Sequence, residues 1–149
     1  MSYPGHPKGC PNYNERSTCP PSSPKLEDVF DIQKGFWVVW NEFDIAAHTC
    51  NMIQEHPDWT ERQSRCCLYW QQTARKQLEK EIQHCLYIIC NKKWQVARTP
   101  EAMGMDVTAT MKSIGVDLEW PPVRIARQIA IIGCVLTPKK PHRRKEFKL

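Results

Sequence analysis

The chain has 149 residues, 41% hydrophobic and 25% charged, with a formal net charge of +5, a composition typical of a soluble globular protein. Residues 139–149 hold six basic side chains and one acidic one, so bases and acids balance over residues 1–138, which argues against a nucleic-acid-binding face on the domain itself. No apolar run approaches the roughly 18 residues of a membrane span and the first twenty residues lack a signal-peptide core, so we expect a cytoplasmic protein.

The first 25 residues are rich in proline, which disfavours a helix or a central strand because proline lacks an N–H group and has a fixed φ. These prolines are Pro4, Pro7, Pro11, Pro20, Pro21 and Pro24. Such a segment would be disordered by itself, so an ordered role requires a cross-link, and a bound metal is the obvious one. We therefore predict a single globular domain over residues 1–138 in which residues 1–25 form a metal loop.

Three elements are expected after the proline-rich segment. We predict a short helix over Leu26–Ile32 and a buried strand over Phe36–Phe43, where aromatic and β-branched residues form one run. A further helix is expected over Ile45–Gln54, and His56-Pro57 then breaks the chain. The core is expected to include the tryptophans that lie in apolar patterns, which are Trp37, Trp40 and Trp70.

A long amphipathic helix is predicted from about Trp59 to about Cys90. Asp58 and Glu61 have the spacing of a helix N-cap and capping box. Apolar residues then recur every three or four positions and mark one buried stripe. The residues of this stripe are Cys67, Trp70, Ala74, Leu78, Ile82, Cys85 and Ile89.

The C-terminal half is expected to contain two short helices and a second strand. Thr99-Pro100-Glu101 has the pattern of a helix start, and Asp106 is expected to cap a short helix that Gly115 ends. Arg124–Leu136 is predicted to contain the second buried strand. These elements indicate an α/β or α+β fold, with a small sheet packed by the long helix and shorter helices, followed by a flexible basic tail over residues 139–149.

The cysteine loop is the candidate functional site. Cys10 and Cys19 lie within the segment Gly9-Cys10-Pro11-Asn12-Tyr13-Asn14-Glu15-Arg16-Ser17-Thr18-Cys19-Pro20-Pro21. In a reducing compartment cysteines serve metal binding, catalysis or packing, and disulfide bonds are the alternative only if the protein is oxidised. Thiolates bind iron or zinc as anions, and neighbouring bases such as Arg16 lower thiol pKa values. The alternative interpretation is a surface loop in which the two cysteines bind no metal and have no catalytic role.

This loop resembles the signature G-C-x-x-Y-x-x-x-x-x-C-P-P of a family of uncharacterised prokaryotic proteins described as predicted metal-binding. The matching residues are Gly9, Cys10, Tyr13, Cys19, Pro20 and Pro21. The family also carries a segment similar to P-E-A-M-G-x-D-V-x-A-T, which is represented here by residues 100–110 and is followed by Lys112 and Gly115. The resemblance implies a metal site at the N-terminal loop.

The chain departs from the family pattern at two places. His6 and Pro7 stand where family members have a further cysteine before the loop. Members also have a C-x-x-C-x-x-C-like cluster before the P-E-A-M-G segment, whereas this chain keeps only Cys85 and Cys90 nearby. We therefore expect one metal site rather than two.

The identity of the metal depends on how many ligands complete the site. A 4Fe-4S iron–sulfur cluster can be held by three cysteines, whereas a structural zinc ion needs four ligands. The cluster is the predicted cofactor, and zinc is the alternative. Cys90 and Cys134 are predicted as additional ligands to Cys10 and Cys19. Packing explains Cys85 and Cys50 more simply, and a solvated histidine explains His6.

Two other functional classes stay open at this stage. The sequence contains no P-loop, G-x-G-x-x-G, H-E-x-x-H or G-x-S-x-G motif, so whether the protein is an enzyme is undecided. If the P-E-A-M-G segment lines a pocket near the metal, Glu101 and Asp106 are acid–base candidates; otherwise it is simply a helix start and a turn. The basic tail could bind nucleic acid in a salt-dependent way, or could only aid solubility.

Overall fold

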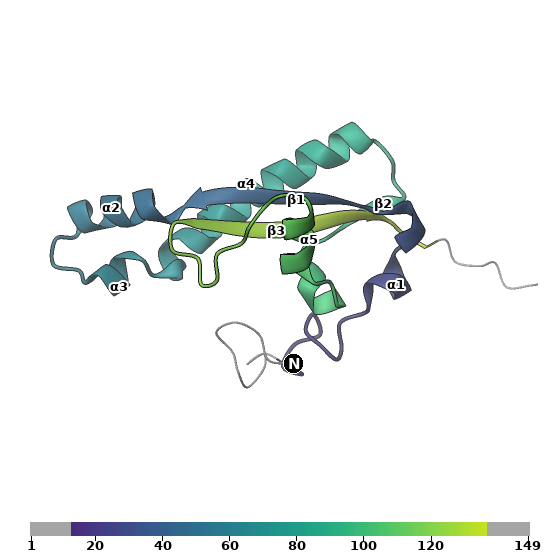
Figure 1. Ribbon diagram of the computed structural model, residues 1–149, viewed down its shortest axis with the longest axis horizontal. Coiled ribbons are helices and arrows are strands. Elements are labelled where there is room, and N and C mark those ends of the chain that lie inside the picture. The colour runs from purple at the N-terminus through teal and green to yellow at the C-terminus, as the bar shows by residue number, and fades with distance from the viewer. Residues whose placement is uncertain (1–12, 137–149) are drawn as a thin grey trace, which may run out of the picture.

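The computed structural model describes residues 13–136 (Figure 1). The predictions for Cys10 and for the tail of residues 139–149 lie outside this range. The described part is an α+β fold, as expected, built on one antiparallel sheet with the strand order β1-β3-β2. Its strands are β1 (Phe36–Asp44), β2 (Trp94–Ala97) and β3 (Ile125–Cys134). No helix in residues 13–136 combines the length and the apolar character that crossing a membrane requires.

The two predicted strands, β1 and β3, form the long pair of the sheet. They are antiparallel, with Phe36 opposite Gly133 and Asp44 opposite Ile125. The short strand β2 pairs with the other side of β3, where Trp94 lies opposite Cys134. The strand β2 was not predicted, because four residues between a helix and a proline carry too little periodicity to be distinguished from a loop.

One face of the sheet is covered by the long helix α4 (Cys67–Ile89), which lies behind the strands in Figure 1. Its buried stripe is the predicted one in its central part, and it packs against Val39, Ala130 and Ile132 of the sheet. The buried residues of the helix are Trp70, Ala74, Leu78 and Ile82. Cys67, which was also placed in the stripe, is exposed because it is the first residue of the helix.

The start of the long helix differs from the prediction. The short helix α3 (Glu61–Ser64) comes first, and its capping box is made by Thr60 and Gln63 rather than by Asp58 and Glu61. Cys66 has φ −59° and ψ 127° and therefore interrupts the helical path. The indole Nε1 of Trp70 donates to the Arg65 carbonyl at 3.3 Å, so the break itself is held by the first turns of α4.

A single buried asparagine joins β1 to α4. Asn41 donates from Nδ2 to the Ala74 carbonyl at 2.9 Å, and its Oδ1 accepts from the Gln128 backbone at 3.1 Å. Both ends of the amide are therefore satisfied between a helix and two strands. A buried polar group with both functions paired fixes the position of its neighbours, so Asn41 sets where α4 crosses the sheet.

Short segments cover the opposite face of the sheet. They are α1 (Leu26–Val29), the 3-10 helix η2 (Pro100–Met103) and α5 (Val107–Ser113), whereas the 3-10 helix η1 (Ile32–Lys34) lies at the end of the sheet, where Lys34 approaches Cys134. Asp106 caps α5, as predicted, by accepting from the Ala109 backbone at 2.8 Å. Gly115 follows the helix with φ +82°, a left-handed conformation that favours glycine. The helix α2 (Ile45–Glu55) continues β1 beyond the end of the sheet (Figure 1).

Two further core predictions are wrong. Trp37 is 59% exposed because it lies on β1, an edge strand, where packing from α4 does not enclose it. Cys50 is exposed as well because it lies on the outer side of α2, away from the buried residues Ile45 and Thr49.

Candidate metal site

The cysteine loop folds back on itself through main-chain hydrogen bonds. The Asn14 amide donates to the Pro20 carbonyl at 2.8 Å, and the Cys19 amide donates to the Arg16 carbonyl at 2.9 Å. Asn14 has φ +62°, a left-handed conformation that asparagine tolerates. A further bond, from the Ser23 amide to the Cys19 carbonyl at 3.0 Å, continues the turn. Residues 14–23 are thus a closed loop without a helix or strand.

Cys19 lies inside this closed loop and its thiol is free. Its side chain is partly buried, and its backbone both donates and accepts a hydrogen bond within the loop. Cys10 lies outside the described residues. Only four residue steps separate it from Asn14, a chain length that spans at most about 14 Å, so covalent reach does not prevent the two thiols from sharing an ion.

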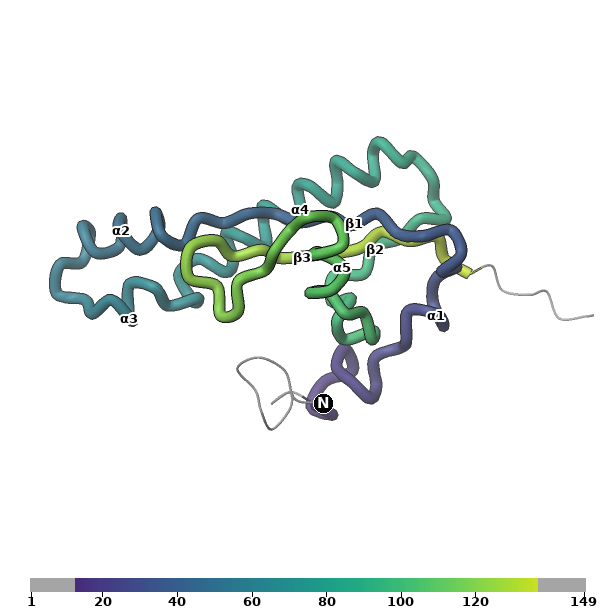
Figure 2. The backbone as a smooth tube through the Cα atoms, in the orientation of Figure 1, coloured from purple at the N-terminus to yellow at the C-terminus, as the bar shows by residue number. Residues whose placement is uncertain are grey.

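The loop leads into a contact between the two segments that carried the family resemblance. Leu26 and Val29 of α1, which follow the loop directly, pack in one hydrophobic cluster with Met103 and Met105 of the P-E-A-M-G segment. The buried centre of this cluster is Phe30, Ala97 and Ile131. Figure 2 traces the loop, α1 and this segment on the same side of the sheet. Two segments more than 70 residues apart in sequence therefore meet in the fold.

The acid–base candidates of this segment have different environments. The Asp106 carboxylate is used as the N-cap of α5. Partial burial raises the pKa of the Glu101 carboxyl, although the residue keeps an exposed surface. Pro100 beside it is fully buried. Glu101 thus lies at the edge of the cluster that contains Met103 and Met105.

The two additional cysteines lie at the end of the sheet where β2 begins and β3 ends, and the Cys134 carbonyl accepts there from the Asp31 amide, just after α1, at 2.8 Å. Cys90 follows α4 as its C-cap, is exposed, and has a left-handed φ of +46°. Cys134 is the last residue of β3 and is 3% exposed. Side chains alternate along a strand, so Cys134 points to the same face as Ala130 and Ile132, the face covered by α4. The cysteine loop leads instead to the opposite face, through α1.

Cys134 has a charged neighbour. The Lys34 ammonium lies 3.6 Å from its sulfur and 3.4 Å from the Asp31 carboxylate. The interaction with Cys134, followed by that with Asp31, raises the pKa of Lys34. Cys85, which packing was expected to explain, is partly buried against the cluster of Val39, Leu78 and Ile82. Within residues 13–136, no three His, Cys, Asp or Glu side chains lie close enough together to hold a metal ion.

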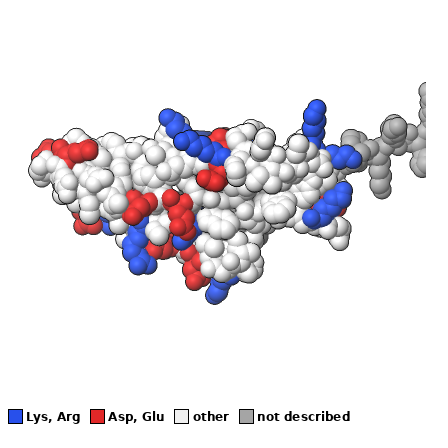
Figure 3. All heavy atoms as spheres, turned by 90° about the horizontal axis from the view of Figure 1, so that it is seen from above, with Lys and Arg blue, Asp and Glu red and all other residues white. Residues whose placement is uncertain are grey.

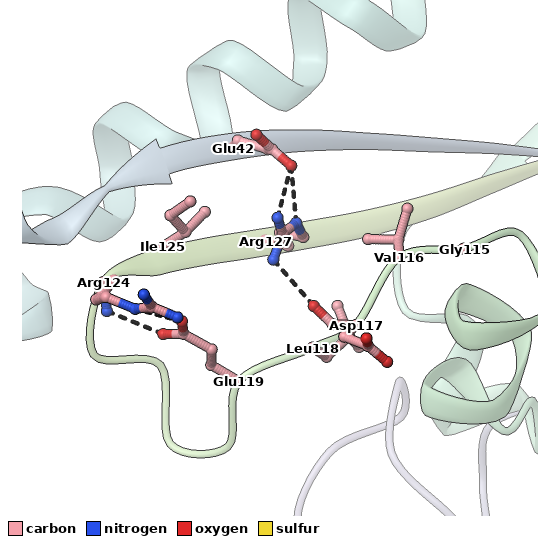
Figure 4. Close-up of a pocket in the computed structure, with 9 residues that line it drawn as sticks. All are labelled: Glu42, Gly115, Val116, Asp117, Leu118, Glu119, Arg124, Ile125 and Arg127. Carbon is pink, nitrogen blue, oxygen red and sulfur yellow. Dashed lines mark hydrogen bonds and ion pairs between the residues drawn. The ribbon is translucent and has the colours of Figure 1, made fainter.

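A shallow pocket of about 420 Å³ lies on the α5 face, at the far end of β3 (Figure 4). Arg127 crosses it and donates to the Glu42 carboxylate at 2.8–2.9 Å and to the Asp117 carbonyl at 3.0 Å. This arrangement was not predictable from the sequence, because Glu42 and Arg127 are 85 residues apart and only the strand register places them opposite each other. Their charges neutralise each other, so the arrangement braces the sheet and leaves no free charge on Arg127.

The loop beside this pocket is held by Glu119. Its carboxylate accepts from the backbone N–H groups of Arg124 at 2.9 Å and Val123 at 3.1 Å, and from the Arg124 guanidinium at 3.1 Å. These bonds, the backbone ones first, lower the pKa of Glu119 to about 2. Glu119 is therefore a structural anion that closes the connection into β3.

The fold and the site together define a small α+β domain with a free cysteine in a closed, proline-rich loop. Over residues 6–137 the sequence matches the model of the family described as predicted metal-binding protein (DUF2284). The match covers most of the chain, so the protein belongs to this family, and the predicted resemblance is confirmed at the family level. No curated protein and no solved structure matches the chain.

Proposed function

We propose that the protein holds an iron–sulfur cluster at its N-terminal loop, with Cys10 and Cys19 as thiolate ligands. Membership of a predicted metal-binding family supports a metal site, and all the candidate cysteines fall within the matched residues 6–137. The observation that carries the proposal is the position of Cys19, a free and partly buried thiol in a loop closed by backbone hydrogen bonds.

The chemistry of the donors fits a thiophilic metal. A thiophilic metal ion binds cysteine as the thiolate and displaces its proton, and Cys19, a free and partly buried thiol next to Pro20, can provide such a ligand. In this proposal Cys19 is the ligand from the closed loop, Cys10 is the second thiolate, and further groups complete the site. Cys90 and Cys134 are weaker candidates for these further ligands. Cys90 lies at the end of α4 and Cys134 points to the α4 face, whereas the loop leads to the opposite face. Zinc is the alternative metal.

The loop residues have defined tasks in this proposal. The bond from Asn14 to Pro20 closes the loop, and the bond from Ser23 to Cys19 fixes the main chain of the ligand. Leu26 and Val29 anchor the loop on Met103 and Met105 of the second family segment. A bound cluster would supply a redox-active or Lewis-acid centre. Apolar packing beneath it would limit solvent access, which is one of the factors that tune such a centre.

The test is purification of the full-length protein without oxygen, followed by iron, sulfide and zinc analysis. We expect a brown protein that absorbs at about 400 nm, as iron–sulfur proteins do, and loss of the colour and most of the iron in Cys19→Ser. The matched control is Cys50→Ser, which changes an exposed cysteine on α2 and should leave iron and colour unchanged.

The possible results separate the alternatives. Stoichiometric zinc in a colourless protein that is lost in Cys19→Ser would replace the cluster by a structural zinc site. Equal metal content in the wild type and Cys19→Ser would contradict the loop site. A metal-free wild type that unfolds cooperatively would contradict the proposal as a whole.

A further inference from the structure

The outer edge of strand β1 has no partner strand within residues 13–136. The strand is nine residues long and lies at one side of the sheet, with β3 as its neighbour on the other side. Ile45 donates to the Arg124 carbonyl at 2.8 Å, next to the pair Asp44–Ile125. Hydrogen-bonded and non-hydrogen-bonded pairs alternate along an antiparallel ladder, so this bond shows which residues of β1 are bonded to β3. The backbone groups of the odd-numbered residues bond to β3, and the even-numbered residues direct their N–H and C=O groups away from β3, toward the outer edge.

The outward groups of β1 have no backbone partner within residues 13–136. Natural proteins protect such an edge with proline, lysine, a bulge or a covering segment. Residues 36–44 contain no proline, lysine or glycine, and they pair with β3 in continuous register without a bulge. The edge is thus a regular template for another extended chain.

We propose that the partner is a second copy of this chain, paired antiparallel along β1 about a two-fold axis beside Trp40. In this register each hydrogen-bonded pair joins two even-numbered residues, which are the ones whose backbone N–H and C=O groups point outward. It uses all nine residues of the strand. The resulting pairs, each between one copy and the other, are Trp40 with Trp40, Val38 with Glu42, Phe36 with Asp44, Trp37 with Phe43, and Val39 with Asn41.

The charges of the edge are compatible with self-pairing. An axis at Glu42 would place two carboxylates opposite each other, and like charges directly opposite are destabilising. An axis at Val38 would leave residues 41–44 without partners. The axis at Trp40 avoids both, and the remaining charge of Glu42 is neutralised within each copy by Arg127 at 2.8 Å.

Exposed apolar side chains fit the same arrangement. Trp37, which is 59% exposed, gains an aromatic partner in Phe43 of the second copy, and aromatic cross-strand pairs stabilise sheets. In Figure 1 the last turns of α4 extend beyond β1. Figure 3, which views that side, shows a largely uncharged surface there with Lys and Arg side chains at its margins. Tyr87 and Ile88 at this end of α4 are 84% and 66% exposed.

The two-fold axis also relates the α4 helices. They lie on the same face of the joined sheet and run antiparallel, so the end of one helix is directed toward the start of the other. Exposed apolar residues occur at both places, with Leu68 and Tyr69 at the start of α4 and Tyr87 and Ile88 at its end. A self-complementary pattern of this kind is what a two-fold interface requires.

The test is the mass of the full-length protein in reducing buffer, measured by light scattering and sedimentation over a range of concentrations. We expect the wild type to reach twice the monomer mass of 17.4 kDa. Trp40→Lys and Trp40→Glu, each measured alone, should dimerise about tenfold or more weakly because like charges meet at the axis. An equimolar mixture of the two variants should form a heterodimer, since opposite charges then meet.

Controls keep this test decisive. Trp37→Lys changes a side chain that is already largely exposed, so it should fold normally and also weaken the dimer. Ile114→Lys changes another exposed apolar side chain, away from β1, and should leave the mass unchanged. Thermal melts confirm that each variant is folded.

Several results would overturn the proposal. They are a monomeric wild type, a dimer that none of the β1 substitutions weakens, and Trp40 variants that fail to associate when mixed although the Trp37 variant dimerises normally. A wild type that becomes dimeric only after residues 139–149 are deleted would also overturn it, and would assign the edge to that segment.

Discussion

On one face of the sheet, four buried residues of α4 pack against a row of strand residues, whereas the other face is covered by short segments, among them α1, η2 and α5. The α4 face is built from one continuous periodic segment and one buried asparagine. The other face joins α1 to the P-E-A-M-G segment and adjoins the cysteine loop. The comparison suggests that the first face provides stability and that the second carries the function, because catalytic and binding groups concentrate on loops held by a rigid scaffold.

The largest effect is expected for a cavity on the α4 face. Ile82 is fully buried between the helix and the sheet, so Ile82→Ala should lower the free energy of unfolding by about 2–5 kcal/mol. Ile53→Ala on α2, where the side chain is 43% exposed, is the matched control and should cost much less. Denaturant unfolding measures both. Similar losses for the two variants would show that α4 does not form the stabilising core.

The next effect concerns the polar bridge on the same face. Asn41→Ala removes the acceptor of the Gln128 amide and the donor to Ala74, and should cost about 1–3 kcal/mol because a buried group is left unpaired. Gln77→Ala removes only a longer contact of 3.4 Å with the same amide and should cost less. Equal free energies of unfolding for these two variants would contradict the role given to Asn41.

A smaller effect is expected on the opposite face, at the cap of α5. Asp106→Ala removes the bond to the Ala109 amide and should cost about 1 kcal/mol, whereas Asp106→Asn should keep most of the cap. Thermal unfolding monitored by circular dichroism gives both values. If Asp106→Asn retained stability but lost bound metal, Asp106 would have a second role at the proposed site.

The smallest effect depends on pH. The pKa of Glu119 in the folded protein, about 2, lies below the ordinary value of 4.5. Its contribution to stability is therefore present above pH 4.5 and is lost as the pH falls from about 4.5 to about 2. Glu119→Gln should lack this part of the acid dependence. Parallel melts of both proteins between pH 2 and 6 measure the difference, and identical pH profiles would contradict the assignment.

The sequence predicted the structure best where a residue determines its own local backbone conformation, or where apolar residues recur with a regular period. The strands β1 and β3, the centre of α4, the Asp106 cap and the turn at Gly115 were all predicted correctly. The cap of α3 was assigned to Asp58 rather than to Thr60, because several residues near a helix start have capping side chains and only the path of the chain selects one. The strand β2 was too short to have a period.

The candidate site was predicted in part. The sequence pattern singled out Cys19 and the family segment at residues 100–110, and the structure adds the contact between α1 and Met103. That contact was not predictable, because hydrophobic residues that meet across 70 positions show no periodic relation in the chain. The roles of Cys10, Cys19, Cys90 and Cys134 as ligands remain predictions.

The sequence by itself determined the α+β class, the main helix and strands, the proline-rich loop and membership of a predicted metal-binding family, since these follow from local conformational preferences and motif spacing. Tertiary structure alone decided which face of the sheet each segment covers, that Glu42 meets Arg127, and that one edge of β1 has no partner strand within residues 13–136. These features depend on strand order and register, which arise from the packing of distant segments and are not encoded in any local stretch of residues.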